Sequence, residues 1–191
     1  MKTITHLALL VGFALLSPAT YAADKPLPIE EWYLLGGVGQ SHPGLGDTQE
    51  RVKTTDLIIR RESPVGGVRG SGTYKYRRTF LLELPVHLLR SPNESPMIGL
   101  SFQACWTFVA RPDLQPYFFV GGGPVYTEAD IPGTSSKVKG SYGAGVGIKL
   151  NSDQGQFLVE YRYHHLSNGG IEKPNDPLNS SKLFMGVKLD L

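Results

Sequence analysis

Apolar and polar side chains alternate along several separate segments of this chain, and that alternation limits the fold more than any other feature of the sequence. Because neighbouring side chains of a strand point to opposite faces, alternation over about ten residues predicts a strand with one apolar face. Beyond the first residues, no apolar run is long enough for a membrane-spanning helix. The pattern predicts eight strands, over 32–40, 52–60, 74–86, 98–108, 116–125, 138–150, a stretch after the NSDQG turn, and 182–191.

The two faces of these strands differ in a way that indicates a membrane protein. One face is apolar, as with Ile98, Leu100 and Phe102, while the other is small or charged. Ten residues is also about the length that a tilted membrane-spanning strand needs. We therefore predict an all-β fold, an eight-stranded antiparallel transmembrane β-barrel. The alternative is a soluble sandwich or lipocalin-like barrel, and the final residue, Leu191, favours it because outer-membrane barrels commonly end on an aromatic residue.

The amino terminus predicts export. Lys2, an apolar run and small residues up to Ala22 are typical of a secretory signal peptide, so we expect a signal peptide over 1–22 and one barrel domain over 23–191. Cys105 is the only cysteine, which leaves no internal disulfide. Without Lys2, the 19 Lys and Arg residues become 18 against 17 Asp and Glu, and a nearly neutral chain is no bulk nucleic-acid binder.

The lengths of the connections predict an orientation in the bacterial outer membrane. Barrels of this kind start in the periplasm and have short periplasmic turns and longer outer loops. The short RPDLQ and NSDQG connections would then be periplasmic, and loops 126–137 and 168–181 would lie outside the cell. The connection 61–72 is longer than a periplasmic turn should be.

His165 and Ser167 lie two residues apart where the seventh strand ends, so their side chains share one face. An imidazole that can take a proton from an alcohol is the minimum arrangement for nucleophilic catalysis. The rest of that face is apolar or aromatic, with Phe157, Val159, Tyr161 and Tyr163. A catalytic pair that faces lipid implies a lipid substrate. The opposite face carries Glu160, Arg162 and His164, for which we predict a salt-bridged interior that includes Lys149 or Lys188.

The segment RYHHLSNGGIEKPND resembles the carboxyl-terminal part of the PagL-type lipid A 3-O-deacylases, which carry HxSNxG followed by PN. The resemblance implies an eight-stranded outer-membrane barrel that removes the ester-linked 3-hydroxyacyl chain at position 3 of lipid A. It also implies a Ser/His/Glu triad with His165 as base and Ser167 as nucleophile. The position of the family's glutamate is occupied here by Asn179, for which Asp176 or Glu172 would be substitutes at a different spacing.

The remaining roles follow from the same resemblance and from the chemistry of ester hydrolysis. We expect the Asn168 side chain and the backbone N–H groups of Gly169 and Gly170 to stabilise the oxyanion, Asn175 to structure the loop, and Asn179 to orient the imidazole. The expected partners are lipid A or lipopolysaccharide of the outer leaflet and membrane lipids, with a homodimer left open. No metal or cofactor motif is present. The alternatives are a non-enzymatic structural or adhesive barrel and an outer-membrane phospholipase or esterase.

Overall fold

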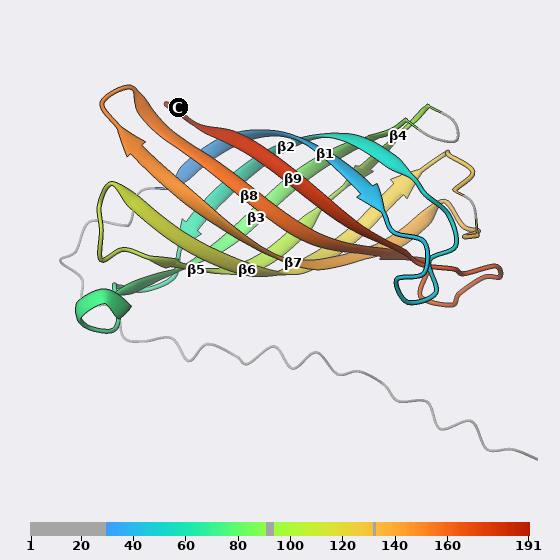
Figure 1. Cartoon of the computed structure of the whole chain (residues 1–191), viewed down its shortest axis with the longest axis horizontal. Coiled ribbons are helices and arrows are strands. Elements are labelled where there is room, and N and C mark those ends of the chain that lie inside the picture. The colour runs from blue at the N-terminus through green and yellow to red at the C-terminus, as the bar shows by residue number, and fades with distance from the viewer. Residues whose placement is uncertain (1–29, 91–93, 132) are drawn as a thin grey trace, which may run out of the picture.

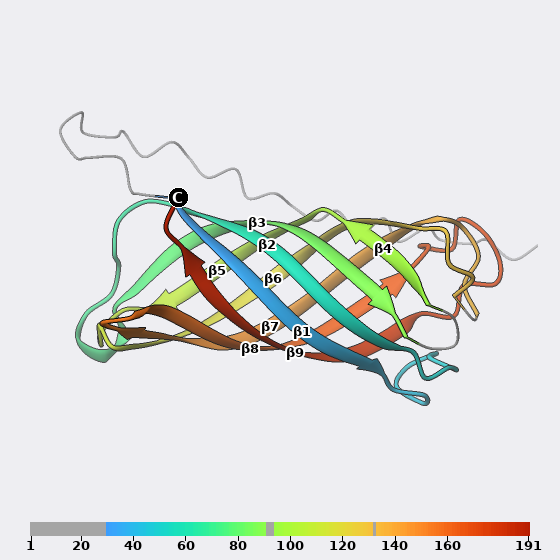
Figure 2. The ribbon, with the colours of Figure 1, turned by 90° about the horizontal axis from the view of Figure 1, so that it is seen from above.

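Strands with alternating apolar and polar side chains close into an antiparallel barrel and are tilted relative to its axis (Figures 1 and 2). The computed structural model describes residues 30–90, 94–131 and 133–191. The predicted signal peptide lies outside these residues. The described residues form nine strands: β1 Glu31–Ser41, β2 Lys53–Pro64, β3 Tyr76–Leu89, β4 Ser95–Gly99, β5 Ser101–Phe108, β6 Leu114–Thr127, β7 Val138–Ser152, β8 Gly155–Ser167 and β9 Leu178–Leu189. A short 3-10 helix, η1, covers Gly72–Tyr74.

The nine strands fill eight positions around the barrel, because β4 and β5 are two halves of one strand. Both pair with β3 on one side and β6 on the other. The register is the same before and after Leu100, the one residue that separates the two halves. Pro85 and Pro124 flank the interruption, and proline has no N–H to donate to a strand ladder. Since β1 pairs with β9 and β2 with β3, the ring closes without a free edge. The predicted eight-stranded antiparallel barrel is confirmed.

Apolar side chains cover the outer wall and polar side chains fill the interior. Exposed outward residues include Leu57, Val120 and Leu183, which leaves a belt that only lipid would cover favourably. Inside, Arg60 pairs with Glu83 at 2.7 Å and with Glu160 at 2.6 Å. The other members of this buried network are Arg162, which contacts both glutamates, and Lys149, which pairs with Glu62. Lys188 instead pairs with Glu31.

Long connections gather at one end of the barrel, called the loop end here, at the right of Figure 1. The described parts of these long connections are 42–52, 128–131, 133–137 and 168–177, whereas the opposite end has 65–75, 109–113 and 153–154. The 65–75 connection is long because it forms its own small structure, with η1 and a bridge between Arg69 and Tyr76. No helix among the described residues is long and apolar enough to span a membrane.

Candidate active site

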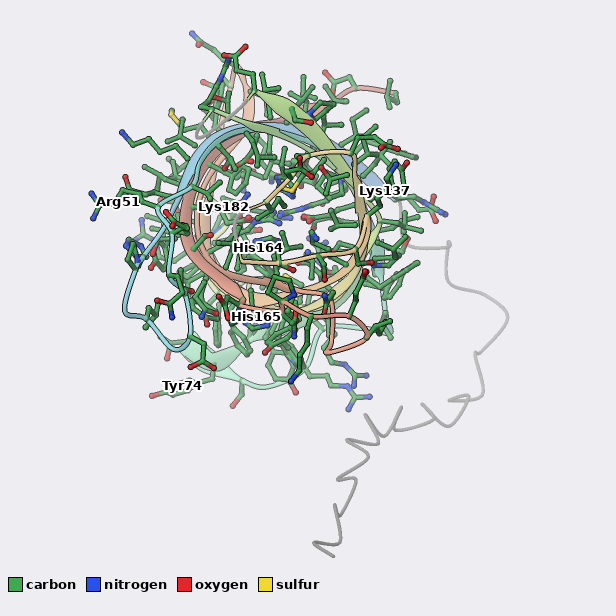
Figure 3. The ribbon with its side chains drawn as sticks, turned by 90° about the vertical axis from the view of Figure 1, so that its right-hand side faces the viewer. Arg51, Tyr74, Lys137, His164, His165 and Lys182 are labelled. Atoms are coloured by element: carbon green, nitrogen blue, oxygen red, sulfur yellow. The ribbon has the colours of Figure 1, made fainter. Side chains whose placement is uncertain are left out.

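The end of β8 carries two adjacent histidines that point in opposite directions. Figure 3, viewed from the loop end, shows His164 inside the lumen and His165 on the outer wall. Strand alternation produces this split, since Tyr161 and Tyr163 are exposed on the same outer face while Glu160 and Arg162 are buried. Ser167 follows on the outer face at the end of the strand. His165 and Ser167 therefore share the lipid-covered face of the barrel.

The side chain of Asn179 contacts the imidazole of His165 directly, with 2.7 Å between Oδ1 and Nδ1. The sequence placed Asn179 in a loop, but β9 begins at Leu178 and pairs Asn179 with His165 across the β8–β9 ladder. The hydroxyl of Tyr163 donates to the same Oδ1 at 2.6 Å. The pairing of strands thus brings the predicted orienting residue to the predicted base.

Hydrogen bonds on the other side of Asn179 fix which way its amide faces. Nδ2 donates to the backbone carbonyl of Leu45 at 2.8 Å and to Thr48 Oγ1 at 3.0 Å. A carbonyl can only accept, so Nδ2 must face the loop and Oδ1 must face His165. His165 Nδ1 therefore carries the hydrogen, and its Nε2 is left with a free lone pair. That is the tautomer a general base needs.

The connection 42–52 folds back over the outer wall and covers Asn179, which is only 4% exposed. The hydroxyl of Thr48 donates to the Pro177 carbonyl at 2.8 Å and accepts from the backbone N–H of Asn179 at 2.9 Å. The N–H of His42 donates to the carbonyl of Asn179, also at 2.9 Å. Every polar group of Asn179 is satisfied, which compensates its burial. Nothing in the SHPGLGDTQER segment distinguished Thr48 as a contact of this site.

Tyr142 and Gly140 of β7 shape the surface beside the pair. The ring of Tyr142 stacks on the His165 imidazole, with 4.3 Å between centroids and 23° between planes. Gly140 lies opposite Ser167 in the ladder, and a side chain there would meet nothing closer than 3.8 Å. The stack restricts the imidazole, while the glycine leaves open space next to the Ser167 hydroxyl. Ser167 and His165, both described by the structure, are not hydrogen-bonded to each other.

Asn168 holds the following loop together rather than facing open space. Its Nδ2 donates to the Glu172 carbonyl at 2.7 Å, and its Oδ1 accepts from the N–H of Gly170 at 2.9 Å. Its own N–H donates to Asn175 Oδ1 at 2.8 Å. The predicted oxyanion donors Asn168 and Gly170 are thus already hydrogen-bonded within the loop, because the chain turns back on itself there. Gly169 is exposed and has a φ of 68°.

A second outer loop, 128–137, packs against this one. The N–H of Ser135 donates to the Pro174 carbonyl at 2.9 Å, and the N–H of Asp176 donates to the Gly133 carbonyl at 2.6 Å. Lys139, buried at the start of β7, donates through Nζ to the carbonyls of Ser135 at 2.9 Å and of residue 136 at 2.5 Å. The loop after Ser167 is therefore braced from the neighbouring strand.

The lumen holds another serine and histidine close together. Ser141 Oγ and His164 Nε2 are 2.8 Å apart, and the His87 ring lies 5.5 Å from that of His164. His87 Nδ1 is 2.7 Å from Asp56 Oδ1, which also accepts from Lys182 at 3.0 Å. All of these residues except Asp56 border a cavity of about 30 Å³, room for roughly one water. The cluster is enclosed by the barrel wall and separated from the outer pair.

Comparison with known proteins gives one family. The family model described as "Lipid A 3-O-deacylase (PagL)" matches residues 74–188, more than half of the chain. No curated protein matches this sequence. Among solved structures, the outer membrane enzyme PagL superposes with a TM-score of 0.62 at 16% identity, over 84% of this chain and 100% of that one. Neisserial surface protein A superposes with a TM-score of 0.60 at 12% identity, over 85% and 97%. Both share the barrel fold.

Proposed function

This chain belongs to the lipid A 3-O-deacylase (PagL) family and is a barrel of the bacterial outer membrane, and we propose that it hydrolyses the ester-linked acyl chain at position 3 of lipid A. The observation that carries the proposal is the arrangement at His165: an outward imidazole, locked by Asn179 in the tautomer that leaves Nε2 free, on the face that carries Ser167. Lipid A fits the site because its esters lie among the acyl chains that cover this wall.

In the proposed reaction, Nε2 of His165 takes the proton of Ser167 Oγ as that oxygen attacks the ester carbonyl. The tetrahedral intermediate collapses to an acyl-serine, and the departing sugar hydroxyl receives the proton from His165. Water then gives a proton to His165 and attacks the acyl-serine, which releases the fatty acid and restores Ser167. The hydrogen bond from Ser167 to Nε2 would form by rotation about the Cα–Cβ bond of the serine when substrate binds.

The oxyanion requires donors that are not already used. We assign this role to the backbone N–H of Gly169 and to Nδ2 of Asn175. The second choice rests on amide geometry: because Asn175 Oδ1 accepts from the N–H of Asn168, its Nδ2 points the other way. Asn168 and Gly170 would then act by holding the loop in shape, a role that differs from the one expected from the sequence.

Asn179 would orient His165 but could not neutralise the imidazolium that forms during the reaction. An amide oxygen carries only a partial charge, whereas the family's glutamate would carry a full one. The hydroxyl of Tyr163 shares the same oxygen and helps to hold it in place. We therefore expect turnover below that of a relative with a carboxylate at this position.

Mass spectrometry of lipid A from Gram-negative cells that express the chain tests the proposal. Loss of one hydroxyacyl group by the wild type, but not by Ser167→Ala or His165→Ala, is the expected result. Heat-modifiable mobility on a gel would show that each variant has folded into a barrel. An unchanged lipid A spectrum with folded protein would favour a non-enzymatic barrel. Release of acyl chains from phospholipid alone would favour a phospholipase.

A further inference from the structure

A groove of about 490 Å³ runs along the outer wall across β9, β1 and β2, starting at Tyr161, two strand positions from Tyr163. Small outward side chains create it. Val38 and Thr55 are neighbours across the β1–β2 ladder, and Gly36 precedes Val38 on the same face with open space above it. Leu183 and Tyr161 border the groove on the side of the catalytic pair. Its apolar floor lies on the surface that acyl chains cover.

Two exposed cations, Lys53 and Arg90, line the groove where it reaches the loop end, while a third lining residue, Lys182, is buried and pairs with Asp56 in the lumen. Their backbones are adjacent, because the N–H of Arg90 donates to the Lys53 carbonyl at 2.8 Å. Arg90 Nε donates to Thr55 Oγ1 at 3.2 Å, which holds the guanidinium beside the groove. None of the described Asp or Glu residues lines it. Arg51, two residues before Lys53, is also exposed, and Figure 3 shows it on the outside of the barrel.

Within the part of the chain that the structure describes, Arg90 pairs with a single acid, Glu94, and this pair is weak. Glu94 lies 2.9 Å from Arg90, but the two side chains are 69% and 45% exposed, and surface pairs of this kind contribute little. Among the described residues, Lys53 makes no ion pair. An anionic group could thus displace Glu94 and gain two charge-assisted contacts. The groove combines an apolar floor for a chain with a cationic edge for a phosphate.

The distance from the catalytic pair suits a single lipid molecule. Tyr163, Ser181, Gln40 and Lys53 follow one another across three strand pairings. At about 4.8 Å for each pairing, Lys53 lies roughly 14 Å around the wall from the strand of His165. A glycolipid with a phosphorylated sugar headgroup and several acyl chains can span this distance. The headgroup of a two-chain phospholipid is too small to reach from one position to the other.

We propose that this groove is the substrate subsite for the phosphorylated, multiply acylated glycolipid whose ester reaches Ser167: one acyl chain lies along Val38 and Leu183, and a phosphate binds Lys53 and Arg90. The inference rests on the proposed function, because it assigns a binding position to the same substrate.

Steady-state kinetics of the full-length protein in detergent micelles test the cationic edge. The probes are purified lipid A and the same lipid A after phosphatase treatment. Lys53→Gln with Arg90→Gln should raise KM for the phosphorylated lipid about tenfold or more, with kcat little changed. KM for the dephosphorylated lipid should not respond. Lys137→Gln, which removes a loop-end cation on another part of the wall (Figure 3), is the matched control and should change neither KM.

Filling the groove gives a second test. Val38→Trp should weaken binding of lipid A, whereas Val120→Trp, at a similarly exposed lipid-facing position outside the groove, should not; the two valines are 59% and 51% exposed. Retention of lipid A by the Ser167→Ala protein, measured by native mass spectrometry, reports binding without turnover. It therefore tests the groove even if the chain proves to have no deacylase activity.

Three results would overturn the inference. One is a wild-type KM that does not depend on the phosphates, and another is an equal effect of the Lys53/Arg90 and Lys137 variants. The third is equal retention of lipid A and of phosphatidylethanolamine by the Ser167→Ala protein, which would make the groove a general lipid contact.

Discussion

The two faces of the β7–β8 wall hold the same pair of residue types in different settings. On the inside, His164 contacts Ser141 in an enclosed polar cluster with His87, Asp56 and Lys182. On the outside, His165 shares a face with Ser167 under a loop that fixes only its orienting partner. The inner serine and histidine satisfy each other, whereas the outer serine has open space beside it. Under the proposed function, access to the serine, and not residue type, distinguishes the outer pair from the inner one.

Substitution of His165 and substitution of His164 should give the largest difference in activity. His165→Gln removes the proposed base and should lower kcat for lipid A deacylation by about three orders of magnitude or more. His164→Gln keeps a hydrogen-bonding group next to Ser141 and should leave kcat within a few-fold of the wild type. Assays of purified, folded protein in micelles measure both. Equal losses in the two variants would mean that the outer pair has no special role.

Glu83 should show the opposite behaviour, with a large effect on stability and a small one on activity. Its carboxylate contacts Arg60 and Arg162 inside the barrel. Glu83→Gln leaves two buried guanidinium groups short of a counter-charge, which should cost about 3–5 kcal/mol of unfolding free energy. Urea unfolding in lipid bilayers measures this change in unfolding free energy. The exposed Glu94 provides the control, and Glu94→Gln should be nearly neutral; similar costs for the two would contradict a charge-stabilised lumen.

Asn179 should have an intermediate effect on activity. Asn179→Ala leaves His165 Nδ1 without its acceptor, so both tautomers and several ring orientations become populated. We expect kcat to fall about 10- to 100-fold, by analogy with the loss of the hydrogen-bond partner that orients a metal-bound histidine. Met185→Ala, which changes an exposed outward residue of β9 away from the groove, is the control. An Asn179→Ala enzyme with wild-type kcat would remove the orienting role.

Lys139 should have the smallest effect of the four. Lys139→Met removes the ammonium group that holds the carbonyls of loop 128–137, so that loop should become easier to cleave by protease, and kcat should fall a few-fold. Lys137→Met is the comparison: its exposed hydrogen bond to Glu128 raises the pKa of Lys137 but braces nothing else. Equal protease sensitivity of the two variants would argue against bracing by Lys139.

The sequence predicted the barrel because alternation is a local property that each strand carries by itself. The faces of His164 and His165 follow from the same alternation. Asn179 was placed opposite His165 only by the β8–β9 register, and its position on a strand was missed because the residues that follow it, Ser180 to Lys182, are all polar. The contacts from Leu45 and Thr48 could not be predicted, since more than 130 residues separate them from Asn179. The hydrogen bonds of Asn168 depend on how two loops pack.

Labelling with a lipophilic fluorophosphonate is the most direct test of the claim that the outer serine is the reactive one. Such a probe phosphonylates an activated serine with loss of fluoride, and peptide mass spectrometry locates the adduct. We expect an adduct on Ser167 in the wild type and in His164→Gln, and none in His165→Gln. An adduct on Ser141, or undiminished labelling of Ser167 in His165→Gln, would contradict it.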